Sequence, residues 1–379
     1  MQLKQIMITV SCAAMSFSMA SPATAAIDEQ DANYLFRYFS DANDVGVHSH
    51  YGNYGLNLEN GVQGVVRWNH EVVIMPAIEA QAGTPEALDA ITTASRPISS
   101  ANGAFEEYRK TRDELQADLG TERVNLGYYL STESDYFAQQ VRGSTNVNLF
   151  DQNLNLSFGS SYGWDQIEPL VDDDTATPDD SKSTLHVNAV ATQILSPTTI
   201  LRVGGEINWV DGLLHNPYRN VYAGGGPEVE VHPSERVRRD VFVRVHQYLK
   251  NRSSIKLEYR LYGDDWGVGS HTLGTRLSQY ITNDVVVRYR YRYYTQTAAD
   301  FYREEYETSD GVDGFRTGDY RLEDFNSHLF GAQLGVNLGA LPIAKSVLQG
   351  FDLSVKYERY FNSNNFSANV LETGLAYRF

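Results

Sequence analysis

The sequence predicts an all-β protein, a transmembrane antiparallel up-and-down β-barrel of about 16 strands. Three features of the 379-residue chain support this fold class. Apolar and polar side chains alternate with a period of two in many segments, as in a β-strand with two different faces. The connections between these segments are alternately short and long. Beyond the N-terminus no apolar run is long enough for a transmembrane helix, and the mean hydropathy is −0.39, as alternating barrel strands produce.

The clearest alternating segment is residues 285–296, VVVRYRYRYYTQ. As a strand it places valines and tyrosines on one face and Arg288, Arg290 and Arg292 on the other. The apolar face would meet a second sheet in a soluble sandwich. In an outer-membrane barrel it would meet lipid, and the arginines would face a wet lumen. Elsewhere the second face carries Gly, Ser, Asn, Gln and charged residues, which suit a lumen better than a core, so the pattern favours the barrel.

Sixteen segments fit this alternation. The fourth is the weakest, because it also fits a short amphipathic helix, and 14 strands is the alternative. The count must be even if both chain ends lie on the periplasmic side. The predicted strands are 33–41, 47–58, 62–74, 106–118, 122–132, 136–148, 153–164, 183–195, 199–210, 239–249, 254–265, 269–281, 285–297, 327–338, 351–362 and 366–379.

The predicted connections segregate by length. The short ones are tight turns made of turn-forming residues, and the long ones are polar and rich in Gly, Pro or acidic residues. In bacterial outer-membrane barrels, short turns face the periplasm and long loops lie outside the cell. The short turns are 151–153, 196–198, 250–252 and 282–284, and the long loops are 76–104, 165–182, 211–238 and 298–325.

The first 25 residues have the features of a secretory signal peptide. A short basic opening precedes a mostly apolar stretch over residues 6–19 and an Ala23-x-Ala25 cleavage pattern. A membrane anchor fits less well, because a spanning helix needs ~20 apolar residues. A lipoprotein signal ending at Cys12 would have too short an apolar core. We therefore expect residues 1–25 to be cleaved, leaving a cysteine-free chain, residues 26–379, as a single barrel domain in the outer membrane.

The last predicted strand ends on Phe379, with Leu375 and Tyr377 on the same face. It resembles the C-terminal signature of outer-membrane barrels that the barrel-assembly machinery recognises. The alternative is an ordinary edge strand that ends in phenylalanine. Aromatic residues at strand ends predict girdles at both membrane interfaces, in contact with lipid and lipopolysaccharide. They are Trp164, Trp209, Tyr293 and Phe361 on the loop side, and Phe351 and Phe379 on the turn side.

Several motifs resemble a family of predicted outer-membrane β-barrels, domain of unknown function 3570. The resemblance is strongest from about residue 200 onward. It implies the fold and the location, and it offers no catalytic residues to transfer. The motifs are His215-Asn-Pro-Tyr-Arg219, Val229-Glu-Val-His-Pro-Ser-Glu-Arg-Val-Arg-Arg-Asp240, Tyr259-Arg-Leu-Tyr-Gly-Asp-Asp-Trp-Gly-Val268 with Ser270-His-Thr272, Tyr293-Tyr-Thr-Gln-Thr-Ala-Ala-Asp-Phe-Tyr302 and Tyr377-Arg-Phe379.

The sequence carries no diagnostic motif for catalysis or cofactor binding. It has no glycine-rich phosphate loop and no HExxH helix, and the net charge of −17 argues against nucleic acid. Ser270 and His271 leave open the possibility of a hydrolase site, and His215 and His232 leave open the possibility of a metal site. Neither spacing is diagnostic. The acidic stretch 172–180 leaves open a Ca²⁺ site, although a solvated loop explains it more simply. We expect no enzyme activity, metal or cofactor.

A basic wall is the most specific functional feature of the predicted lumen. Alternation turns further basic residues inward beside the three arginines, against one inward acid in that sector, Glu258. Their predicted neighbours are small or polar, among them Gly274 and Gly331. The predicted lumen-lining basic residues are Arg244, Lys256, Arg260, Arg276, Arg288, Arg290 and Arg292, with His246 among them.

Rings of arginine favour anions in pores, so we expect a porin-like or gated channel for small anionic solutes. The alternative is a plugged structural or scaffold barrel of an envelope complex, in which acids neutralise the arginines. A barrel-embedded enzyme has less support. The solute and the oligomeric state do not follow from the sequence. The candidate neutralising acids are Glu206, Asp352, Glu358 and Glu372, or a folded-in loop with Asp300, Glu304 and Glu305.

Overall fold

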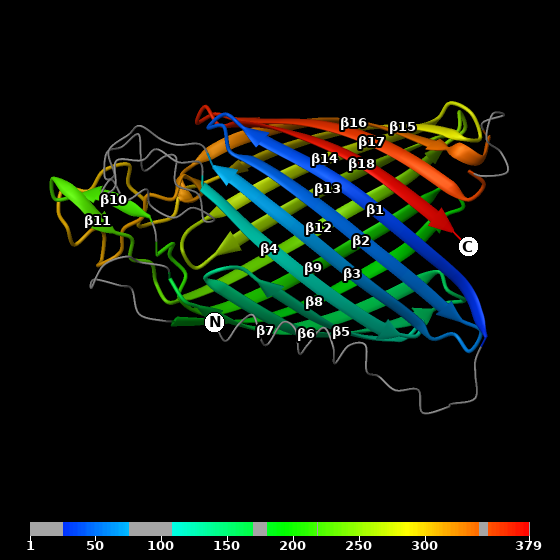
Figure 1. Cartoon of the computed structure of the whole chain (residues 1–379), viewed down its shortest axis with the longest axis horizontal. Coiled ribbons are helices and arrows are strands. Elements are labelled where there is room, and N and C mark those ends of the chain that lie inside the picture. Colours follow the sequence, from blue (N-terminus) through cyan, green and yellow to red (C-terminus); the bar gives the residue numbers. More distant parts are fainter. Residues whose placement is uncertain (1–25, 76–107, 170–179, 218, 341–347, 379) are drawn as a thin grey trace.

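The computed structural model describes residues 26–75, 108–169, 180–217, 219–340 and 348–378. Its main feature is one closed antiparallel sheet of sixteen strands (Figure 1). Each barrel strand pairs with the next one along the chain, and the last strand pairs with the first, which closes the barrel. A separate two-stranded sheet interrupts the numbering, so that β9 pairs with β12. The fold is therefore an up-and-down barrel.

The barrel strands are β1 (Ile27–Asp41), β2 (Gly46–Leu58), β3 (Gln63–Met75), β4 (Tyr108–Gly120), β5 (Val124–Thr132), β6 (Tyr136–Leu149), β7 (Leu154–Ile167), β8 (Asp180–Ser196), β9 (Thr199–Gly212), β12 (Glu235–Leu249), β13 (Ser253–Asp264), β14 (Gly269–Tyr280), β15 (Val285–Gln296), β16 (Phe325–Asn337), β17 (Phe351–Asn362) and β18 (Ser367–Arg378). The connections hold β10 (Asn220–Ala223), β11 (Gly226–Val229) and the 3-10 turns η2 (Tyr320–Leu322) and η3 (Leu338–Ala340). Among the described residues, no helix is long and apolar enough to cross a membrane.

The predicted count of sixteen strands is confirmed, and the alternative of 14 is wrong. The ambiguous fourth segment forms β4, which pairs with β3 on one side and β5 on the other. At the loop end some strands begin earlier than predicted, β8 at Asp180 and β12 at Glu235. Both faces are polar or charged there, so the hydrophobic alternation that marks the membrane-spanning part is absent.

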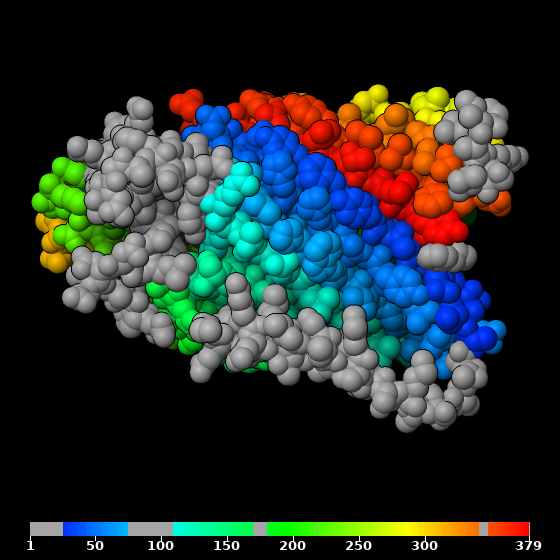
Figure 2. All heavy atoms as spheres, in the orientation of Figure 1, coloured from blue at the N-terminus to red at the C-terminus, as the bar shows by residue number. Residues whose placement is uncertain are grey.

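The outward face of the barrel is apolar and exposed. On β13, Leu257 is 47% exposed and Tyr259 46%, while Glu258 between them pairs with another inward side chain, Arg244. Large apolar side chains are exposed on most of the other strands as well. Figure 2 shows the part of this outer surface that β1 to β4 form, with β18 next to β1. A belt of apolar side chains around a closed barrel is suited to lipid contact, as in a transmembrane barrel.

The two ends of the barrel differ as predicted. Tight turns at one end need left-handed backbone, as at Gln152 (φ 68°) and Arg252 (φ 62°). Two long connections lie at the other end, residues 213–234 between β9 and β12 and residues 297–324 between β15 and β16. In Figure 1 the β10–β11 hairpin projects beyond this end. The predicted loop 76–104 and most of loop 165–182 lie outside the described residues.

Candidate functional site: the barrel lumen and the loop cap

The predicted basic residues lie on the inward faces of four consecutive strands, β12 to β15. The strand register places Lys256 opposite Arg276, and Arg276 opposite Arg290. Arg244 lies opposite another basic residue, Arg202 of β9. Because side chains of directly opposite residues lie on the same face, His246, Lys256, Arg276 and Arg290 form one row of basic side chains across β12 to β15, and Arg202 and Arg244 begin the adjacent row, which continues to Glu258. Arg260, Arg288 and Arg292 extend these rows along their strands.

Carboxylates neutralise only part of this wall. Glu258 accepts a hydrogen bond from Arg244 at 2.7 Å and lies 3.6 Å from the Lys256 ammonium. Glu358 of β17 pairs with Arg290 at 2.9 Å. In the described part of the chain, three of the predicted lumen-lining arginines have no ion pair, Arg276, Arg288 and Arg292, and Arg202 of β9 has none either.

Arg260 is held differently from its neighbours. Its guanidinium lies 3.4 Å from both Glu206 and Asp240. From sequence, Glu258 was the one inward acid predicted in this sector. Asp240 has the same parity on β12 as Arg244, so the alternation could have identified it.

The opposite wall of the lumen is internally neutralised. β4 is eight strands from β14 in the sixteen-strand ring, so the two strands face each other across the lumen. On this side Arg67 pairs with Asp118 at 2.6 Å, and Arg142 pairs with the same carboxylate. Arg112 pairs with Glu71 at 3.0 Å. The uncompensated positive charge is therefore concentrated on one side.

The space beside the basic wall is open to water. A recess of about 250 Å³ is lined by Arg276, Arg290 and Arg292, with Gly274 among them. A Cβ added at Gly274 would meet only the Cβ of Glu258, at 3.8 Å. The Arg290 side chain is 35% exposed although it faces the barrel interior. Partial exposure of inward charges indicates a wet lumen, as expected for a barrel of this size.

The other candidate acids do not neutralise the three arginines. Glu372 pairs with Arg37 at 2.8 Å and with Lys356 at 2.6 Å. Asp352 makes no ion pair with a described residue. The loop acids Asp300, Glu304 and Glu305 belong to the connection at the loop end, and among the described residues they form no ion pair with the arginines of β15.

The two long loops and the short β13–β14 connection pack together into one unit, here called the loop cap (residues 213–217, 219–234, 265–268 and 297–324). Bridges of backbone hydrogen bonds join Ala223 to Tyr306 and Val231 to Arg316. Its apolar core contains Trp266, 5% exposed, whose ring centroid lies 5.3 Å from that of Phe301. Several of the sequence motifs therefore build the loop cap rather than the lumen.

A buried ion cluster that was not predicted from the sequence lies in the loop cap. Arg219 and Glu230 are each 1% exposed, and Thr317 is fully buried. The Arg219 guanidinium lies 3.2 Å from Asp319 and 3.7 Å from Glu230. Thr317 donates a hydrogen bond of 2.9 Å to Glu230, and Arg321 donates one of 2.6 Å to Asp319. Charged groups without water are stable only in such networks.

The cluster shifts the acidity of its members. Burial raises the pKa of Glu230. Burial would also raise the pKa of Asp319, but hydrogen bonds from Arg321 and the charge of Arg219 outweigh it and hold this pKa well below its usual range.

Comparison with known proteins identifies the family. The family described as Protein of unknown function (DUF3570) matches residues 6–373. The chain belongs to this family. No curated protein matches it.

Among solved structures, the siderophore receptor PirA from Pseudomonas aeruginosa is 10% identical, with a TM-score of 0.44, and covers 89% of this chain. The chain spans only 57% of that receptor's length. The outer membrane protein OprD from Pseudomonas aeruginosa is 12% identical, with a TM-score of 0.46 and 93% coverage of both chains. A loop-deletion mutant of OmpT from Vibrio cholerae is 9% identical, with a TM-score of 0.42, and the alignment covers 94% of this chain and 100% of that one. The closed strand ladder itself establishes the barrel in the DUF3570 protein.

The histidines of this DUF3570 chain do not form a site of the kinds considered from sequence. Ser270 and His271 are successive residues of β14 and point to opposite faces, with His271 bonded outward to the Tyr259 hydroxyl at 2.7 Å. The rings of His215 and His232 lie 6.1 Å apart. Burial lowers the pKa of His232 to about 4. Among the described residues, no group of three or more His, Cys, Asp or Glu side chains is arranged to hold a metal ion.

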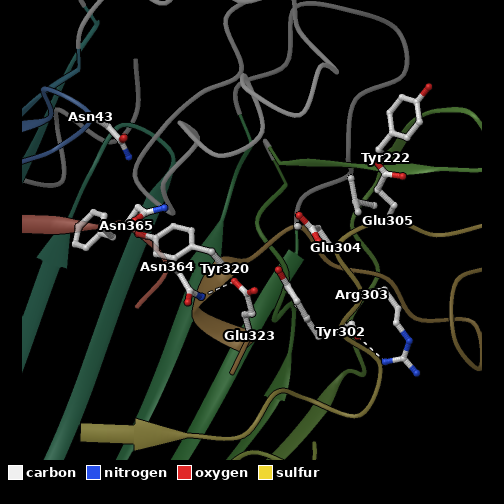
Figure 3. A pocket seen from close by; sticks show the side chains of 13 residues that line it. Asn43, Tyr222, Tyr302, Arg303, Glu304, Glu305, Tyr320, Glu323, Asn364 and Asn365 are labelled. Carbon is white, nitrogen blue, oxygen red and sulfur yellow. Dashed lines mark hydrogen bonds between the residues drawn. The ribbon is translucent and has the colours of Figure 1, made fainter. Parts of the chain in front are cut away.

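A second recess, of about 550 Å³, lies between the loop cap and the rim of the barrel (Figure 3). Tyrosines, asparagines and the carboxylates of Glu304, Glu305 and Glu323 line it. Asn364 donates a hydrogen bond of 2.6 Å to Glu323, which Figure 3 shows as a dashed line. Its acidic lining would favour neutral or cationic solutes over anions, in contrast to the basic wall of the lumen.

Proposed function

We propose that the protein is an outer-membrane channel whose lumen favours small anionic solutes. The observation that carries this proposal is the set of inward arginines Arg276, Arg288 and Arg292, which have no carboxylate partner among the described residues. The opposite wall provides the contrast, because Arg67, Arg112 and Arg142 each pair with an acid there. The proposal includes no catalytic activity.

Two features support the location. The exposed apolar belt requires a lipid environment, and aromatic side chains occupy strand ends, as in the Phe351–Tyr377 stack at 4.3 Å on the turn side. The signal peptide expected over residues 1–25 and the last residue of the assembly signal, Phe379, lie outside the described residues, and both signals remain predictions. Leu375 and Tyr377 of that signal lie on β18, next to β1.

Anion preference would arise from the field of the uncompensated wall. Low-dielectric protein around a narrow aqueous space strengthens the field of charges on its wall and raises the local concentration of counter-ions. Since the three arginines face water but have no carboxylate partners among the described residues, mobile anions would act as their counter-ions. Cations would be depleted from the same cross-section.

A closed barrel is the second candidate, and a chain of ion pairs favours it. Arg37, Glu372, Lys356, Glu358 and Arg290 are linked in sequence across β1, β18, β17 and β15. Such a network would stiffen one side of the wall. It does not include the three arginines without partners.

Liposome swelling separates the two candidates. Purified barrel would be reconstituted into vesicles and exposed to isotonic solutions of a neutral sugar, a small organic anion or an organic cation of similar size. A channel of the proposed type admits the organic anion fastest. No swelling above protein-free vesicles would favour the closed barrel, and faster entry of the cation would contradict the anion preference.

A further inference from the structure

The basic wall has an arrangement that is unfavourable without a bound anion. Lys256, Arg276 and Arg290 lie directly opposite one another on three adjacent strands. Like charges at directly opposite positions destabilise a sheet. The two nearby carboxylates, Glu258 and Glu358, are each already shared between two cations. The remaining charge faces only water and mobile ions, so a bound anion would relieve the repulsion.

The geometry around Arg276 indicates what size of partner fits. Arg288 and Arg292 flank Arg290 at spacings of ~7 Å along the strand, because alternate residues of a strand share a face. Gly274 lies opposite Arg292, and Gly331 lies opposite Arg290. Gly274 leaves room beside the guanidinium groups, because a Cβ there would meet only the Cβ of Glu258 at 3.8 Å, whereas the Glu358 side chain fills the space at Gly331. The recess of about 250 Å³ that Arg276, Arg290 and Arg292 line is small enough for one compact group, and Arg288 lies outside its lining.

We propose that Arg276 and Arg292 form, in this recess, a saturable binding site for a compact oxyanion that carries two or more negative charges, such as a diphosphate or a tricarboxylate, and that the nearby charge of Arg288 strengthens it. Three uncompensated guanidinium groups require more than one negative charge. Guanidinium forks match the paired oxygens of phosphate and carboxylate groups and bind them with two hydrogen bonds each. The site rests on the proposed function, because it requires a lumen open to solutes.

Calorimetric titration of the folded protein in detergent tests the site, with inorganic pyrophosphate as the probe and chloride at the same ionic strength as the reference. We expect one saturable pyrophosphate site and none for chloride. The triple variant R276S/R288S/R292S should bind pyrophosphate at least about tenfold more weakly, since it removes two bidentate charge-assisted pairs and one nearby positive charge. Heat-modifiable mobility on gels would verify folding of every variant.

Two further variants distinguish a specific binding site from a general effect of lumen charge on anions. R276K/R288K/R292K keeps the three charges but removes the forks, so it should retain anion preference in conductance and lose pyrophosphate affinity. R67S/R112S/R142S removes three charges from the opposite wall and should leave pyrophosphate affinity within about twofold of the parent, because distant lumen charges are screened. An equal loss of affinity in both serine variants would overturn the site.

The outcomes separate this inference from the proposed function. Anion-selective conductance without saturable pyrophosphate binding overturns the site and leaves the channel standing. Saturable binding that is unchanged in R276S/R288S/R292S also overturns the site. Absence of both conductance and binding in folded protein would refute the channel and the site together.

Discussion

Arg276 and Arg290 lie directly opposite each other on β14 and β15, and of the two only Arg290 has a carboxylate partner in the described structure, Glu358 at 2.9 Å. The charge of the lumen wall therefore depends on which arginines lack an acid rather than on how many arginines there are. Glu358 itself is 6% exposed and also contacts Lys356 at 3.5 Å. Removing this one carboxylate should change both the field and the stability of the barrel.

Glu358→Gln should strengthen anion preference and lower stability. The change leaves Arg290 and Lys356 without this negative charge, and a cost of roughly 1–3 kcal/mol is expected for losing one partner of a largely enclosed pair. The reversal potential in bilayers would report the anion preference. The temperature at which the gel mobility changes would report the stability. Glu228→Gln, which removes the same charge from a 41% exposed carboxylate of the β10–β11 hairpin, is the control and should change neither quantity. Unchanged selectivity in Glu358→Gln would show that this carboxylate does not tune the lumen.

Glu230→Ala should loosen the loop cap while leaving the barrel intact. It removes a buried carboxylate beside the buried Arg219, and breaking a buried pair typically costs about 3–5 kcal/mol. Hydrogen exchange should increase in residues 213–234 and 297–324 and stay unchanged in the strands. Glu228→Ala, whose carboxylate is 41% exposed and pairs with Arg316, is the matched control. Equal exchange in both variants would mean that the cluster does not hold the cap together.

Loop-cap stability should fall on acidification between pH 6.5 and about 4. The pKa of His232 is lowered by burial from 6.5 to about 4, so in this window an opened cap binds a proton that the closed cap does not. Stability therefore rises with pH across the window, by at most about 3 kcal/mol. The lowered pKa of His215 acts in the same direction.

Glu230 and Asp319 contribute to the pH dependence of loop-cap stability with opposite signs and in different pH ranges. The raised pKa of Glu230 gives a contribution that is lost as pH rises through its folded pKa, whereas Asp319, with a lowered pKa, stabilises above its usual 3.8. His232→Phe should therefore flatten the pH dependence without abolishing it. Fluorescence of a variant that keeps only Trp266, whose ring lies 5.3 Å from His232, would follow cap opening. A pH profile identical to that of the parent would exclude His232 as the sensor.

Orientation gives a further prediction. A tag inserted at Gly225 should be labelled on intact cells, because this residue lies at the tip of the β10–β11 hairpin with no neighbouring side chain within 4 Å of its Cβ position. A tag at Asn251, in the tight turn between β12 and β13, should be labelled only after the outer membrane is opened. The reverse pattern would place the long loops in the periplasm.

The strands and the inward direction of the arginines could be predicted from sequence, because alternation is a local property of each strand. Even the weak segment predicted at 106–118 coincides with a strand, β4, over Tyr108–Gly120. The buried cluster of Arg219, Glu230 and Asp319 could not, because its members come from two loops about ninety residues apart in the chain and follow no period. The pairing of arginines with carboxylates also depends on the register between strands, as for Arg290 and Glu358. No local sequence pattern predicts that register.

Reversal potential in planar bilayers under a KCl gradient tests the central claim most directly, with the parent protein and with R288S/R290S/R292S. The parent should be anion-selective, most strongly at low salt, where the wall charges are least screened. The triple variant should lose most of that selectivity while remaining conductive. Cation selectivity in the parent, or unchanged selectivity after removal of three inward arginines from β15, would contradict the account.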